Sequence, residues 1–170
     1  MLASDTALSS QRFARFQNRE EVGVITFSER PAATRLFPMG SAPEQNAKAR
    51  AEVREFINSL ETGGATAIYS SLTEALNELG DERAHAREKR YYTAVLMTDG
   101  ENNRGMDAAK FRNWYASQGE RIHGVRVFPI LFGEGSAREL TSIADVTGGR
   151  MFDSKSKSLA AVFKEIRGYQ

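Results

Sequence analysis

Two oxygen-bearing side chains, each placed after a break in an apolar pattern, are the strongest candidates for chemistry. Asp99 follows the apolar run Ala94–Met97 and Thr98, and it opens the polar loop "DGENN". Thr66 follows a glycine pair in "TGGAT", at the start of a predicted helix. A threonine hydroxyl and an aspartate carboxylate are hard oxygen ligands, suited to Mg²⁺ and poorly suited to zinc or copper. The two residues therefore predict a magnesium site if the fold brings them together.

Each residue also has a purely structural interpretation. A threonine at a helix start commonly caps that helix, and an Asp-Gly pair after a strand commonly forms only a turn. Two protein ligands are few for a metal, although Mg²⁺ often keeps several waters and takes an oxygen from its partner. The metal site and the two local roles both remain open at the level of sequence.

Signals for covalent or nucleotide chemistry are missing from the chain. It contains no G-x-S-x-G elbow, no P-loop lysine and no G-x-G-x-x-G. It has no cysteine, and its two histidines, His85 and His123, are far apart and are interpreted as surface residues. Magnesium-dependent phosphoryl transfer at Asp99 is a weaker alternative, because Glu101 is the one other acid in that loop and no lysine accompanies it. We therefore expect a protein that is not an enzyme.

Composition indicates one soluble globular domain spanning residues 1–170. Hydrophobic residues make up 41% and charged residues 26%, with a net charge of +1. This balance gives no reason to expect binding to nucleic acid or to an anionic membrane. No apolar run reaches membrane-spanning length, and we expect no secretory signal after Met1.

Strand-like and helix-like segments alternate along the chain. Short apolar segments predict strands, and recurring apolar residues at helical spacing predict helices between them. Such alternation is typical of an α/β fold, with a mostly parallel sheet and helices on both faces. The predicted strands cover residues 21–28, 92–98, 125–133 and 150–154, with a short edge strand between Pro31 and Pro38, and the predicted helices cover 43–60, 66–80, 107–117, 136–149 and 158–169.

Three loops should meet where the parallel strands end, because sites in open sheets form at the carboxyl ends of strands. They are the loop after Phe27, the "TGGAT" loop and the loop that begins at Asp99. Gly64 lets the chain pass close to a ligand or to another backbone. Exposed polar residues of these loops are candidates for contact with a partner, although they suit a solvated turn equally well. The predicted partner-binding residues are Gly64, Glu101, Asn102 and Asn103.

The ordered segments "VGVITFS", "GGATAIYSSLTEAL", "AVLMTDGENN", "VFPILFG" and "LTSIADVTGGRMFDS" resemble the von Willebrand factor type A (VWA) domain. This resemblance implies a three-layer, Rossmann-like fold with a metal-ion-dependent adhesion site (MIDAS). In that family the site takes Asp-x-Ser-x-Ser after the first strand, a threonine from the second loop and an aspartate from the third. Thr66 and Asp99 match the last two. The family's metal binds a carboxylate on a protein partner, which implies adhesion or assembly rather than catalysis.

The tail "LAAVFKEIRGYQ" further resembles VWA domains of bacterial proteins that carry a preceding solute-binding-like domain. By analogy this favours an extracytoplasmic place in a bacterial cell envelope. The absence of cysteine and of a signal fits a cytoplasmic protein equally well.

The sequence departs from the family pattern at its start. It has no Asp-x-Ser-x-Ser motif. The nearest segment is "DTALS", Asp5–Ser9, and no apolar segment that could form the family's first strand precedes it. The segment 1–20 is interpreted as the end of the first helix and its loop, so the family's first central strand would lie upstream of Met1. With two serine ligands missing, we expect weak or absent Mg²⁺ binding in this chain, and a metal-independent interaction scaffold is the alternative.

A sheet without that strand would have two apolar edges, which invite pairing with another chain. Three outcomes are left open by the sequence. Met1 lies inside a longer domain that includes the strand; or another chain or the N-terminal segment fills the gap, through a dimer or strand exchange; or the two flanking strands close on each other.

Overall fold

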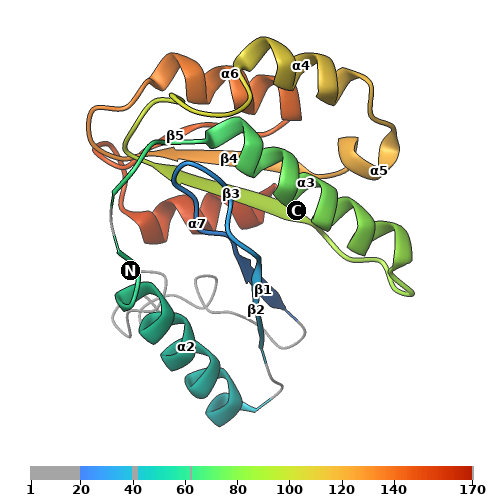
Figure 1. The fold of residues 1–170 in the computed structure, drawn as a ribbon. Helices are drawn as coiled ribbons and strands as arrows, with labels where there is room; N and C mark the ends of the chain where they lie inside the picture. Colours follow the sequence, from blue (N-terminus) through green and yellow to red (C-terminus); the bar gives the residue numbers. More distant parts are fainter. Residues whose placement is uncertain (1–19, 40–41, 62, 170) are drawn as a thin grey trace. The chain divides into compact units, whose positions relative to one another are not determined.

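The computed structural model describes residues 20–39, 42–61 and 63–169 (Figure 1). These residues form two compact units. The first contains the described residues up to Thr26, then Ala33–Gly63 and Leu159–Tyr169. The second contains Phe27–Ala32 and Gly64–Ser158, and it holds both candidate metal ligands. The prediction of a single domain over residues 1–170 stays a prediction.

The first unit is built on an antiparallel hairpin. Strand β1 (Glu21–Val24) pairs with β2 (Arg35–Pro38), and helices α2 (Pro43–Asn58) and α7 (Leu159–Gly168) belong to the same unit. Phe37 is buried with residues of α2, and the Arg35 guanidinium lies 5.3 Å from its ring centroid. The hairpin and α2 therefore share one small apolar core, whose buried members are Phe37, Met39, Ala49 and Val53.

The second unit is built on a parallel sheet in the order β3-β4-β5. Strand β3 (Thr93–Thr98) pairs in register with all of β4 (Arg126–Leu131), and the short β5 (Phe152–Asp153) pairs with the end of β4. The predicted α/β class with a parallel sheet is confirmed. The helices of this unit are α3 (Ile68–His85), α4 (Ala108–Ala116), α5 (Glu120–His123) and α6 (Ala137–Thr147).

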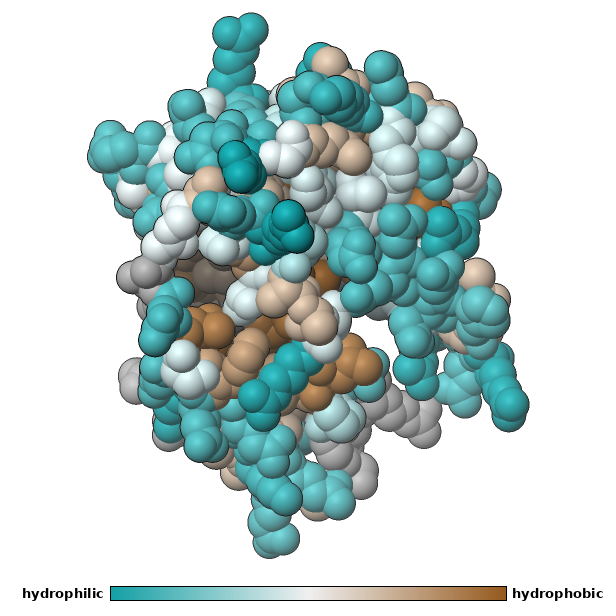
Figure 2. All heavy atoms as spheres, in the orientation of Figure 1, coloured by the Kyte–Doolittle hydropathy of each residue, from teal (hydrophilic) through white to brown (hydrophobic). Residues whose placement is uncertain are grey.

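One face of this sheet carries the main core. Alternate residues of β3 point to the same side, and Ala94 and Leu96 are buried with Val127 of β4 and with apolar residues of all four helices. The outer surfaces of these helices are mostly hydrophilic on the side drawn in Figure 2. None of the helices in the described part of the chain combines the length and apolar character needed to span a bilayer.

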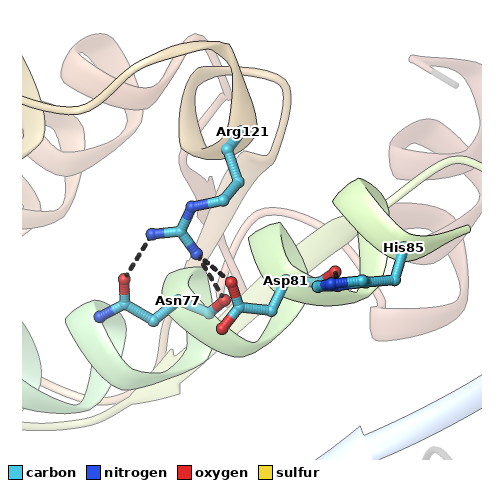
Figure 3. Close-up of polar contacts among 4 residues, drawn as sticks. All are labelled: Asn77, Asp81, His85 and Arg121. Carbon is cyan, nitrogen blue, oxygen red and sulfur yellow. Dashed lines mark hydrogen bonds and ion pairs between the residues drawn. The ribbon is translucent and has the colours of Figure 1, made fainter.

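The prediction that Gly80 ends a helix is wrong, because α3 continues to His85. A Cβ at Gly80 would lie 2.8 Å from Ile122 Cδ1 and 3.1 Å from the Arg121 carbonyl oxygen. The glycine therefore permits close packing of α3 against α5, a short helix that the sequence pattern did not predict. Arg121 of α5 also donates to the Asp81 carboxylate at 2.6 Å and to the Asn77 carbonyl oxygen, both in α3 (Figure 3). These hydrogen bonds join the two helices.

The histidines have ordinary structural surroundings. His85 Nδ1 lies 2.7 Å from the Asp81 carbonyl oxygen, one turn earlier in α3 (Figure 3). His123 Nε2 lies 2.9 Å from the Tyr115 carbonyl oxygen, and the two rings are 4.8 Å apart. Both contacts lie within or between helices, as expected of surface histidines.

Pro129 lies within β4, opposite Leu96 of β3. Proline lacks the N–H that a central strand normally donates. Strand β5 pairs only with Ile130 and Leu131, so the second ladder begins immediately after the proline. The short β5 thus accounts for a proline in the middle strand of the sheet.

The first predicted strand is shorter than expected and lies in a different sheet from β3. Strand β1 ends at Val24, and Phe27 forms an isolated antiparallel bridge with Pro31 where the chain turns back. Strand β1 belongs to the first unit and β3 to the second, and direct closure of the two flanking strands stays a prediction. The segment Asp5–Ser9 and the predicted helix remnant lie outside the described residues. Dimerisation or strand exchange stays a prediction.

We predict that Gly149 cannot be replaced by alanine without a large loss of stability. A Cβ at this position would overlap the backbone carbonyl of Val127, which cannot move without disturbing the sheet. Gly149→Ala should lower the free energy of unfolding by about 3 kcal/mol, measured by urea denaturation. The neighbouring Gly148 ends α6 in the left-handed region with open space around it. Gly148→Asn is the matched control and should cost less than about 1 kcal/mol; equal effects would contradict the prediction.

Candidate metal and partner-binding site

The structure brings together the two loops that carry the predicted metal ligands. The Thr66 loop precedes α3, and the Asp99 loop follows β3 at the carboxyl end of the sheet. A Cβ at Gly100 would lie 3.3 Å from Thr66 Oγ1, so the hydroxyl adjoins the turn that begins with Asp99. Thr66 is half-buried and Asp99 is exposed. The Thr66 hydroxyl and the Asp99 turn thus meet at one place in the second unit.

Thr66 does not cap the helix that follows it. The N-cap of α3 is Ala67, which has no side-chain cap. The Ala67 N–H donates instead to the Ser28 carbonyl oxygen at 2.8 Å, and the Thr66 N–H donates to Asn103 Oδ1 at 2.7 Å. Within the described residues the Thr66 hydroxyl makes no hydrogen bond. Capping of α3 therefore does not explain why a threonine occupies position 66.

The Asp99 carboxylate is likewise not used by its own turn. The Gly100 N–H donates to Thr98 Oγ1 at 3.2 Å, so Thr98 stabilises the turn. The contacts described for this part of the chain include no hydrogen bond or ion pair of the Asp99 carboxylate. The side chain is exposed and available to a ligand.

Glycines let two further loops pack closely against the loops of Thr66 and Asp99. Gly64 has a φ of 86°, and a Cβ there would lie 3.3 Å from Ser28 Cβ. A Cβ at Gly135 would lie 3.1 Å from the Asp99 carbonyl oxygen. The loops after Phe27 and β4 therefore pack directly against the loops that carry Thr66 and Asp99.

Two of the predicted partner-binding residues make hydrogen bonds within the chain. Asn103 and Thr66 form a reciprocal pair, because the Asn103 N–H also donates to the Thr66 carbonyl oxygen at 3.0 Å. Asn102 Oδ1 accepts from the Tyr69 N–H at 3.3 Å, and its Nδ2 donates to the Met106 carbonyl oxygen at 3.0 Å. Asn102 thus satisfies an N–H in the first turn of α3 that has no acceptor within the helix, and Asn103 holds the residue just before its N-cap. Glu101 is exposed, and partner contact by these residues stays a prediction.

Sequence reasoning missed Glu139, in the first turn of α6. Its Oε2 accepts from the Asn102 N–H at 3.0 Å, and its carboxylate also accepts from the Tyr69 hydroxyl. Tyr69 is buried, and burial followed by this hydrogen bond raises the pKa of its hydroxyl far above the usual value. The sequence signal was the spacing Ser136-x-x-Glu139, which is that of a capping box and does not indicate a contact with a distant loop.

Two exposed ion pairs come from loops at this edge of the sheet. Arg104 lies 3.9 Å from Glu29, and Lys155 donates to Glu134 at 2.7 Å. The second pair lowers the pKa of the Glu134 carboxyl and raises the pKa of Lys155. Exposed pairs of this kind contribute little to stability, so Arg104 is a cation that can exchange one carboxylate for another.

The donors suit a hard divalent cation but are few. Thr66 and Asp99 offer one hydroxyl and one carboxylate, the oxygen types that Mg²⁺ accepts. Across residues 20–39, 42–61 and 63–169 no group of three or more His, Cys, Asp or Glu residues is placed to hold a metal. The described residues therefore fit part of a magnesium coordination shell and leave the rest to water or to other oxygens.

The chain belongs to the von Willebrand factor type A domain family, whose model matches residues 7–166. Members of this family mediate protein interactions. The match agrees with the parallel sheet and with the convergence of the Thr66 and Asp99 loops at its carboxyl edge.

A curated relative is the "Probable bifunctional E2/E3 enzyme R795" of Acanthamoeba polyphaga mimivirus. It is 29% identical over 116 residues, which cover 66% of this chain and 9% of the viral protein. The chain thus spans about a tenth of the length of that relative, and the activity in its name belongs to a far longer protein.

Solved structures of proximal thread matrix protein 1 (PTMP1) from the mussel byssus share the fold. One, with zinc in its MIDAS motif, has a TM-score of 0.57 at 19% identity and covers 96% of this chain and 42% of PTMP1. Another has a TM-score of 0.50 at 18% identity and covers 85% of this chain and 34% of that one. A fold of this kind therefore binds a divalent metal in PTMP1.

We predict that Tyr69 makes stability fall in alkaline solution. Its pKa is raised in the folded state, so the folded chain favours the neutral hydroxyl. The resulting stabilisation is complete below the unfolded pKa of about 10 and is lost as the pH rises beyond it. Tyr69→Phe should flatten the alkaline decline of the free energy of unfolding. Some decline should persist, because burial also raises the pKa of Tyr115.

Tyr91, whose exposure is 64%, provides the control. Tyr91→Phe should leave the pH profile of urea denaturation unchanged. An unaltered profile in Tyr69→Phe would show that the buried hydroxyl is not the group responsible.

Proposed function

We propose that this chain is a protein-binding module whose contact site is centred on Thr66 and Asp99. One observation carries the proposal: the Thr66 hydroxyl adjoins the turn that begins with Asp99, and neither side chain is used by the helix or the turn beside it. Fold alone would not support this, because function depends on the site. The family resemblance implies that VWA domains bind ligands at the position of Thr66 and Asp99.

In this proposal Thr66 and Asp99 supply a hydroxyl and a carboxylate to Mg²⁺, and the partner supplies a further carboxylate. The metal, when bound, neutralises the two facing carboxylates and gives the contact its specificity for an acidic group. Gly64 leaves room for close approach at the rim, and Glu101 is exposed beside Asp99. Arg104 adds a positive charge that attracts the incoming acidic side chain.

Catalysis is not part of the proposal. Phosphoryl transfer needs a positioned nucleophile and groups that stabilise the transferring phosphate. Glu101 is the one other acid in the loop Asp99–Arg104, and that loop has no lysine. The name of the viral relative applies to a protein of which this chain matches 9%, so the activity in that name is not carried over to this chain.

We predict weak Mg²⁺ binding by the chain alone, because two protein oxygens are few. At a metal concentration equal to the dissociation constant, binding stabilises a protein by only about 0.4 kcal/mol. Millimolar Mg²⁺ should therefore raise the melting temperature by less than about 2 °C. Asp99→Ala should remove this rise, and Glu101→Ala, on the same loop, should retain it. A rise of several degrees would instead indicate a complete site.

We further predict that partner binding depends on the metal. The purified chain, immobilised in Mg²⁺, should retain a partner that is released by EDTA, with quantitative mass spectrometry as the readout. Asp99→Ala and Thr66→Ala should each lose it, whereas Glu88→Ala, in the exposed connection between α3 and β3, serves as a matched surface control. Binding that survives both EDTA and Asp99→Ala would favour the second candidate, a VWA scaffold that binds without metal through its helices or strand edges.

A further inference from the structure

The Glu139 carboxylate accepts a hydrogen bond from a distant loop rather than from the N-terminus of its own helix. Ser136 caps α6 by accepting the Glu139 N–H at 3.3 Å, and the Ser-x-x-Glu spacing would allow the glutamate to complete a capping box. In the structure the carboxylate instead accepts from the Asn102 N–H and from the Tyr69 hydroxyl. The contact therefore joins three elements: α6, the loop after β3, and α3.

The side chain of Asn102 connects the loop after β3 to the start of α3. Its side chain accepts the Tyr69 N–H at the start of α3 and donates to Met106 at the end of the loop. The adjacent Asn103 holds Thr66 through two hydrogen bonds, of 2.7 and 3.0 Å. Asp99 begins the same loop, three residues before Asn102. The backbone position of Asn102 thus controls how the loops of Thr66 and Asp99 face each other.

We propose that Glu139 is the positioning residue of this site: its carboxylate fixes Asn102, and through Asn102 and Asn103 it keeps Thr66 beside Asp99. The inference deepens the proposed function and rests on it for the metal. The anchoring is physically strong, because hydrogen bonds to a carboxylate are stronger than those between neutral groups. It also lies in a half-buried place, where an Asn102 N–H without an acceptor would be costly.

The first test measures amide hydrogen exchange by NMR in the purified chain. Two amides report on the connection directly: Asn102, which donates to Glu139, and Asn103, which donates to the Thr66 carbonyl. Glu139→Ala should speed exchange at both by about tenfold or more relative to the core of β4. Glu139→Gln, which keeps one acceptor oxygen, should restore part of the protection.

Two variants separate positioning from simple destabilisation. Ser136→Ala removes the cap of the same helix without touching the Asp99 loop, so exchange at Asn102 and Asn103 should rise no more than in the core. Tyr69→Phe removes one of the two donors to Glu139 and should leave the Asn102 contact in place. Equal exchange in Glu139→Ala and Ser136→Ala would overturn the proposal.

The second test uses Mn²⁺ alone as a paramagnetic probe, which detects even millimolar binding through broadening of nearby amide signals. Thr66 and Gly100 should broaden in the unaltered chain and in Ser136→Ala, and about tenfold more Mn²⁺ should be needed in Glu139→Ala. If the unaltered chain shows no broadening at these amides, the metal site of the proposed function is wrong. The exchange measurement then still decides the role of Glu139.

Discussion

Helix α3 begins without a cap of its own, and the organisation of the site follows from how that deficit is met. The first N–H groups of a helix have no hydrogen-bond acceptor within it. Ala67, at the N-cap, has no side-chain oxygen that could accept from them. The acceptors come from elsewhere: the Ser28 carbonyl accepts the Ala67 N–H, and Asn102 Oδ1 accepts the Tyr69 N–H. Asn103 Oδ1 accepts the N–H of Thr66, the residue just before the N-cap. Because the start of the helix depends on two other loops, the three loops must stay together whenever the helix is formed. Thr66 is thereby fixed next to Asp99 without using its hydroxyl.

The sheet supplies the fixed frame for this arrangement. Strands β3 and β4 pair over their whole length, and the ladder continues where the Phe132 N–H donates to the Thr98 carbonyl at 2.9 Å. Thr98 is thus held by the sheet on one side, and its hydroxyl holds the Asp99–Gly100 turn on the other. Gly135 then lets the next loop pack against the Asp99 carbonyl. The backbone position of Asp99 therefore follows from strand pairing, which is far less adjustable than a free loop.

The elements that the sequence predicted well are those with a strong local signal. Helix α6 has a capping serine at one end and Gly148 in the left-handed region at the other, and α2 begins at a proline and carries an apolar stripe. Gly80 shows the limit, since a glycine in a helical pattern can end a helix or admit a neighbour, and the choice depends on Ile122, more than forty residues later. The type of the site residues, Thr66 and Asp99, was visible from chemistry and from the family resemblance. Glu139 was not, because its local spacing indicates a helix cap and only the tertiary structure sends its carboxylate to Asn102.

A site with two protein ligands has a physical consequence for how a partner would bind. If Thr66 and Asp99 leave most of the coordination shell to water, the chain alone binds the metal weakly, and the metal alone stabilises the chain little. A partner carboxylate adds a charged ligand and a second attachment, so metal and partner each raise the affinity for the other by the same factor. Arg104 works in the same direction, since its pair with Glu29 is exposed and weak enough to be replaced. The hydrogen bonds of Glu139 and Asn103 then matter more than they would in a site with many ligands. A small displacement of either the Thr66 or the Asp99 oxygen would leave the metal with one protein ligand.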